Sequence, residues 1–313
     1  MKALKKIKKI LHKSVPLWLV LVLMIQIGLA SGLLEAYVAK QKIQQLVISL
    51  SKTTKNPDQL AQILKQEVLP QAGFTLAVQW KDIGQELLKT GAIDKTKYDQ
   101  LFANEPKSKE QMKYFNGYSS DHMAINENNT HFMVNTLWAI GLVNKIDVLD
   151  NGPMKTVGNG DPMGYASTGG WNLGAKDTSQ IYSSVDILKL TPQQQELVKK
   201  IADNIYRPCC GNPTSFPDCN HGMAALGYVE MAVKQGVSEN RIYKDVAALN
   251  SFWFPQQYVT IAAYFNKQGT NWAKVNPKTL LSQQYSSGQG SQQIQQAVQN
   301  IPGLNVQSGG CGA

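Results

Sequence analysis

The chain has 313 residues, of which 43% are hydrophobic and 17% are charged, so its composition is typical of a globular protein and excludes a disordered one. The net charge is +9, but six lysines among the first thirteen residues supply six of these charges, and only +3 remains for the rest. That remainder is too dilute for a phosphate-binding surface, and no basic stripe interleaved with aromatic residues follows. We therefore expect no nucleic-acid partner.

The N-terminal sequence predicts a membrane segment. Residues 14–34 carry no charge and are rich in Leu, Val, Ile and Met, and this length allows a helix to cross a bilayer. The lysines before the segment predict a cytoplasmic N-terminus and an exported domain. We expect a single-pass protein of the cell membrane whose C-terminal domain is extracytoplasmic. The alternative is a secreted protein, released after cleavage of a signal peptide near Ala30.

Four regions are expected along the chain. They are a basic cytoplasmic leader (1–13), a transmembrane signal anchor or signal peptide (14–38), an exported and mainly helical domain (39–281), and a Gln/Ser/Gly-rich tail that ends near a cysteine (282–313). The composition of the tail indicates a flexible connector at its start, followed by a short amphipathic turn. The expected fold class is mainly α, with the N-terminal helix followed by one predominantly helical globular domain.

Apolar residues at helical spacing predict helices through most of the exported domain. Pro57 marks the start of the first, residues 74–80 predict a short extended segment, and residues 126–144 form the strongest helix. Seven glycines make residues 147–177 a long loop region. Thr191 and the proline after it predict a helix start by capping. The other expected helices span 84–88, 95–102, 107–115, 219–234, 238–249 and 253–265.

Residues 207–222 contain three of the four cysteines and one of the four histidines. Three prolines and two glycines keep this cysteine loop out of regular structure, and irregular loops that carry reactive side chains are common functional sites. Asp218 is a good N-cap and predicts a helix that begins near Cys219, with His221 in its first turn. A helix N-terminus favours the thiolate form of Cys219.

Three hypotheses compete for these residues. Four cysteines in an exported protein commonly form two disulfides, here some pairing of Cys209, Cys210, Cys219 and Cys311. Alternatively, the same four cysteines and His221 are metal ligands, and thiolate with imidazole suits zinc or copper. In the third hypothesis Cys219 is a catalytic nucleophile, with His221 as its acid or base and Cys210 as the resolving thiol.

The expected function is therefore soft-metal binding or thiol redox chemistry by a membrane-anchored extracytoplasmic protein. The alternative is a non-enzymatic envelope protein that is cross-linked internally by structural disulfides and acts through a protein partner. No cofactor is expected other than the metal.

Cys311 lies among glycines near the end of the chain and has no packing partner in the sequence around it. We expect it to dock at the cysteine loop, as a disulfide partner or as a further ligand beside His221. The alternative is an unpaired or intermolecular thiol.

A second group of polar residues, Asp121, His122 and His131, lies at the entry to the strongest helix. A metal or hydrolase role is conceivable for this group, and polar capping is the favoured interpretation.

Overall fold

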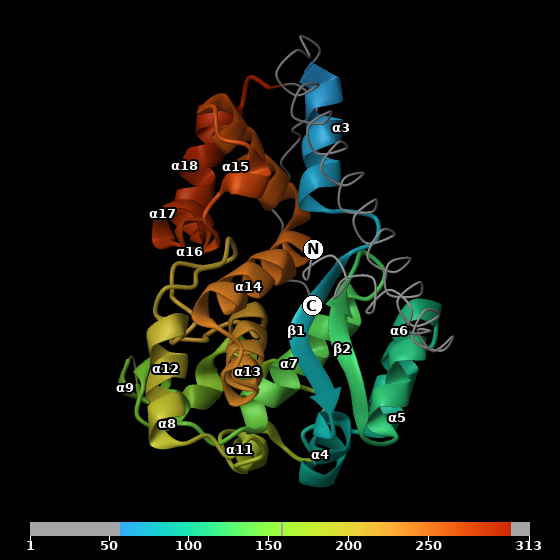
Figure 1. Cartoon of the computed structure of the whole chain (residues 1–313). Helices are drawn as coiled ribbons and strands as arrows, with labels where there is room; N and C mark the ends of the chain where they lie inside the picture. The colour runs from blue at the N-terminus through green and yellow to red at the C-terminus, as the bar shows by residue number, and fades with distance from the viewer. Residues whose placement is uncertain (1–56, 158, 302–313) are drawn as a thin grey trace, which may run out of the picture. The chain divides into compact units, whose positions relative to one another are not determined.

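The structure, a computed structural model, describes residues 57–157 and 159–301 (Figure 1). Helices dominate this part of the chain, which confirms the mainly helical fold class. With the labels of Figure 1, the first elements are α3 (Pro57–Val68), β1 (Phe74–Lys81), α4 (Ile83–Thr90), α5 (Lys95–Leu101), α6 (Pro106–Gln111), η1 (Met112–Phe115), β2 (Ser119–Ile125), α7 (Thr130–Val143), α8 (Asp147–Asp150), α9 (Pro153–Thr156), η2 (Pro162–Gly164) and α10 (Ala166–Gly169). They are followed by α11 (Thr178–Ile181), α12 (Pro192–Ala202), α13 (Asn220–Lys234), α14 (Glu239–Trp253), α15 (Pro255–Lys267), η3 (Trp272–Lys274), α16 (Pro277–Leu280), α17 (Gln283–Ser286) and α18 (Gly288–Val298).

No helix within these residues is both long and apolar enough to cross a membrane. The predicted anchor, residues 14–38, lies outside the described part of the chain.

Strands β1 and β2 pair antiparallel, with Phe74 opposite Ile125 and Lys81 opposite Ser119 (Figure 1). β1 is the extended segment that the sequence predicts, because its buried residues alternate with more exposed ones. β2 was not expected. Its first four residues are polar and lie outside the core, so the sequence shows no alternation until the segment reaches Met123.

The centre of the core is the contact between α7 and α13. α7 is buried along nearly its whole length, as its apolar surface predicts. A side chain on Gly141 would collide with the backbone carbonyl of Met223, and one on Gly227 would collide with that of Leu137. The two backbones therefore touch, and this contact fixes the position of α13, whose N-terminus begins just after Cys219.

Hydrogen bonds from side chains connect β1 to the helices beside it. The carboxylate of Asp245 on α14 accepts a hydrogen bond from the backbone N–H of Ala77 at 2.8 Å. The Gln235 amide accepts from the N–H of Gln79 at 2.9 Å and donates to its carbonyl oxygen at 2.9 Å. These contacts supply β1 with partners that a third strand would otherwise provide.

The glycine-rich region contains short helices instead of one long loop. Two tryptophans hold it in place, because Trp138 Nε1 donates to the carbonyl oxygen of Ser167 at 2.6 Å and Trp171 Nε1 donates to that of Ala92 at 3.0 Å. The N–H of Ser167 donates to the carbonyl oxygen of Asp218 at 3.1 Å. This region therefore borders the cysteine loop.

The start of the C-terminal tail is helical, which corrects the expected flexible connector. Ser287 caps α18 by accepting from the N–H of Gly290 at 3.0 Å. Ile294 and Val298, four residues apart, are buried on one face of the helix. Gln and Ser are compatible with helix when such a cap and such an apolar stripe are present. The Gln/Ser/Gly-rich composition of the segment suggested a flexible chain and gave no weight to the cap or the apolar stripe.

Replacement of Gly141 by alanine tests the contact between α7 and α13. The added methyl group would collide with backbone, so we expect Gly141→Ala to lower the free energy of unfolding by about 1–3 kcal/mol, despite the better helix propensity of alanine. Gly117→Ala is the control, because that position faces open space. Urea denaturation measures both variants. Unchanged or higher stability of Gly141→Ala would contradict the close contact.

Candidate metal and thiol site

The cysteine loop between α12 and α13 closes around the side chain of Arg207, which is 0% exposed. Its guanidinium donates to the carbonyl oxygens of Asn212 (2.9 Å) and Phe216 (3.3 Å), to the carboxylate of Asp218 (2.7 Å) and to the sulfur of Cys219 (3.0 Å). A buried charge is costly unless it is paired and hydrogen-bonded. The loop therefore has to adopt a conformation that surrounds this group.

The first turn of α13 is shaped to the same guanidinium. A side chain at Gly222 would occupy the space of the Arg207 guanidinium, so this position requires glycine. The backbone N–H of Gly222 donates to Cys219 Sγ at 3.4 Å, which makes Cys219 the N-cap of the helix. The sequence suggested Asp218 for that role. Its carboxylate instead binds Arg207 and the side chain of Asn212 (2.8 Å).

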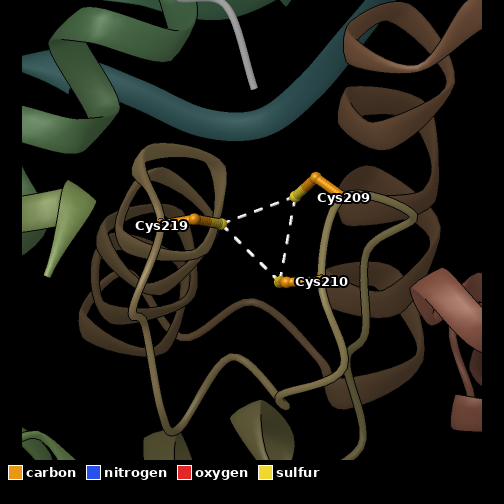
Figure 2. A group of neighbouring side chains, drawn as sticks. All are labelled: Cys209, Cys210 and Cys219. Atoms are coloured by element: carbon orange, nitrogen blue, oxygen red, sulfur yellow. Dashed lines mark hydrogen bonds between the residues drawn. The ribbon is translucent and has the colours of Figure 1, made fainter. Parts of the chain in front are cut away.

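The sulfur atoms of Cys209, Cys210 and Cys219 form a triangle. Its edges are 3.5 Å between Cys209 and Cys219, 3.7 Å between Cys210 and Cys219, and 3.8 Å between Cys209 and Cys210. Figure 2 shows the three side chains pointing toward one another, with Cys219 opposite the adjacent pair. Cys219 is 5% exposed, while the other two are half-buried. No disulfide joins any two of them.

Cys219 and Cys210 differ in acidity. Hydrogen bonds from Cys209 and Cys210, together with the charge and hydrogen bond of Arg207, outweigh burial and hold the pKa of Cys219 well below its usual value. Its hydrogen bond with Cys209 lowers the pKa of Cys210, but the contact with Cys219 and burial outweigh this and raise it. Of these two groups, Cys219 therefore loses its proton more readily, beside a Cys210 thiol that keeps its proton at neutral pH.

His221 is buried beside this cluster against two aromatic rings. Its ring centroid lies 4.5 Å from that of Phe254 and 5.7 Å from that of Trp253. Burial lowers the pKa of His221 to about 4, so the imidazole is neutral at pH 7. Its Nδ1 is buried and has no hydrogen-bond partner among the described residues. The predicted roles of His221, as a ligand or as the acid or base for Cys219, stay predictions.

Within the described ranges, Cys209, Cys210 and Cys219 are the one group of three or more potential metal ligands, and their sulfurs all lie within 4.8 Å of one another. His221 is not part of that group. Cys311, the other predicted ligand, lies outside the described residues.

The second set of candidates is dispersed along β2 and the start of α7. Each of these side chains has its own polar partner, and the three do not converge on one point. Asp121 accepts from the Tyr114 hydroxyl (3.1 Å), His122 Nδ1 contacts the carbonyl oxygen of Leu76 (3.0 Å), and His131 Nδ1 contacts the Glu105 carboxylate (2.8 Å). These contacts agree with the structural interpretation of the group.

Arg207 is the functional residue that sequence reasoning missed. Of the 31 basic residues only two are arginines, and one of them directly precedes the Pro-Cys-Cys sequence. Arginine pairs with buried anions more readily than lysine does. An arginine at this position in a lysine-rich chain was therefore the sequence signal for a buried charge beside the cysteines.

No protein-family model, curated protein or solved structure matches this chain. The function of the site is therefore inferred from its own chemistry.

The low pKa of Cys219 predicts a distinct titration. In the reduced, metal-free protein, we expect the Cys219 thiolate to be protonated only as the pH falls well below the usual thiol pKa, since Cys209, Cys210 and Arg207 stabilise the anion. Ultraviolet thiolate absorbance against pH measures this transition. Cys219→Ser should abolish it, and Cys311→Ser should leave it in place. A single transition of all thiols near their usual pKa would contradict the assignment.

Proposed function

We propose that Cys209, Cys210 and Cys219 bind one soft metal ion, zinc or copper, through their thiolates. The observation that carries this proposal is the triangle of sulfurs, with edges of 3.5, 3.7 and 3.8 Å. In a tetrahedral zinc site with Zn–S bonds of about 2.3 Å, neighbouring sulfurs are about 3.8 Å apart. The triangle needs little adjustment to hold such an ion, and an all-sulfur donor set favours soft metals over calcium or magnesium.

The surroundings of Cys219 support the same proposal. Three thiolates place a large negative charge in a mostly buried site, and Arg207 and the N-terminus of α13 offset part of it. Hydrogen bonds to ligand atoms also fix their orientation, as in other metal sites. Because Cys210 keeps its proton in the metal-free protein, binding releases protons, and affinity falls as the pH is lowered.

A second candidate function is thiol redox chemistry, and the acidity of Cys219 favours it. A stabilised thiolate at Cys219 can attack a disulfide, and Cys209 or Cys210 can then resolve the mixed disulfide. This chemistry requires two sulfurs. The convergence of three sulfurs on one point is better explained by a shared ion.

For the location, we propose a membrane-anchored protein whose domain is extracytoplasmic. The support is the uncharged segment of residues 14–34 and the lysines before it. Cleavage of that segment would give a secreted form of the same domain. In either case the thiols would meet oxidising conditions, where a bound ion protects them from disulfide formation.

Metal analysis of the full-length chain, purified without reductant, tests the proposed function. We expect one zinc or copper ion per chain, and at least a tenfold weaker affinity in Cys209→Ser, Cys210→Ser and Cys219→Ser, since each variant removes a ligand. His131→Ala is the control and should keep the metal. His221→Ala, in the same assay, tests its predicted ligand role.

Thiol counting on the same samples would detect the outcome that contradicts this proposal. A protein without metal, in which mass spectrometry finds the cysteines joined in disulfides, would contradict the proposal and support the envelope protein stapled by disulfides.

A further inference from the structure

The positions of the three thiols limit which disulfides the site can form. Cys209 and Cys210 are adjacent, so their Cα atoms are about 3.8 Å apart, whereas disulfides usually join Cα atoms about 4.4–6.8 Å apart. A disulfide between these two residues is therefore disfavoured. The sulfur of Cys219 lies opposite the pair (Figure 2), 3.5 Å from that of Cys209 and 3.7 Å from that of Cys210. A favourable disulfide within the group therefore includes Cys219.

Cys219 is also the cysteine whose sulfur contacts Arg207. The Nε of Arg207 donates to Cys219 Sγ at 3.0 Å, and the two residues are 0% and 5% exposed. A thiolate accepts such a charge-assisted hydrogen bond, whereas a disulfide sulfur carries no charge and is a weak acceptor. Oxidation of Cys219 therefore removes one anionic partner of a buried guanidinium and leaves only the Asp218 carboxylate. The contact stabilises the reduced state relative to the disulfide.

We propose that the site is a reversible redox switch, in which a peroxide joins Cys219 to Cys209 or Cys210 and thereby releases the bound metal ion. The inference rests on the metal binding proposed above and adds its regulation. Cys209 and Cys210 are half-buried, so a small peroxide can reach their sulfurs. The disulfide removes two of the three sulfur ligands, and this loss lowers the affinity whether or not His221 also binds the ion. Because Arg207 stabilises the reduced state, a dithiol restores the three thiolates.

The oxidation proceeds in two displacements at sulfur. The sulfur of Cys209 or Cys210 attacks one oxygen of hydrogen peroxide, the O–O bond breaks, and the hydroxide that leaves takes up a proton to become water. The Cys219 thiolate then attacks the oxidised sulfur, the S–O bond breaks, and the second oxygen also leaves as water after taking up a proton. Two thiolates thus give two electrons to the peroxide. The third thiolate takes up one proton when the ion leaves.

Peroxide treatment of the zinc-loaded, full-length chain tests the switch. The chain carries Cys311→Ser, so that only the three thiols of the site can react. We expect one equivalent of hydrogen peroxide to release about one zinc ion per chain, measured with a chromophoric chelator, and to lower the protein mass by two hydrogen atoms. Proteolysis before Asp218 separates Cys219 from the adjacent pair, and mass spectrometry should find the two fragments joined. Dithiothreitol should restore zinc binding.

Cys219→Ser in the same background is the control. It should lose no hydrogen atoms, because only the disfavoured disulfide between adjacent cysteines remains possible. Zinc release with Cys209 joined to Cys210, or with sulfinic acid in place of a disulfide, would overturn the inference and leave the metal site intact. Zinc that stays bound after oxidation would overturn it as well. A chain that holds no zinc before peroxide is added would instead contradict the proposed metal site, and the switch with it.

The role of Arg207 is tested with the other arginine of the chain as a matched control. Metal-free Arg207→Lys and Arg241→Lys are equilibrated with reduced and oxidised glutathione. Lysine lacks the planar fork of the guanidinium, so we expect Arg207→Lys to raise the equilibrium constant for disulfide formation about tenfold, the value of one charged hydrogen bond. Arg241 pairs with Asp245 and its substitution should have no effect. Equal constants in the two variants would contradict the role of Arg207. The peroxide experiment retains Arg207, so it tests the switch even if Arg207→Lys does not fold.

Discussion

Arg207 carries a positive charge in a place without access to water, and the cysteine loop is arranged to balance that charge. Its guanidinium reaches two carbonyl oxygens, one carboxylate and one sulfur. These groups come from residues 212–219, so the loop closes around the side chain and brings Cys219 toward the adjacent cysteines. The same contact stabilises Cys219 as a thiolate. Loop conformation and thiol chemistry thus depend on one buried guanidinium, its ion pair with Asp218 and its hydrogen bonds.

This arrangement requires α13 to begin at one defined place. Close packing against α7, at Gly141 and Gly227, sets the position of the helix. Gly222 leaves room for the guanidinium over the first turn, and Cys219 caps that turn. The site is therefore built at the end of the most buried helix pair in the core, while its other two cysteines lie on the half-exposed loop. The proposed metal site thus combines one buried sulfur with two half-buried ones.

Local patterns in the sequence were sufficient to predict much of this structure. Thr191 and Pro192 mark the start of α12, where Thr191 caps the helix as expected, and the apolar stretch of α7 predicts its burial. The grouping of the three cysteines also follows from their positions in the sequence. The features that were missed depend on distant partners. β2 is defined by β1, and the role of Arg207 depends on Cys219, twelve residues later, at the N-cap of α13.

The proposed metal site requires three cysteine sulfurs to bind one ion. X-ray absorption spectroscopy of the zinc-loaded, full-length chain tests this requirement, because it measures the atoms bound to the ion. We expect at least three sulfur neighbours at about 2.3 Å. A coordination shell of only nitrogen and oxygen atoms would contradict it.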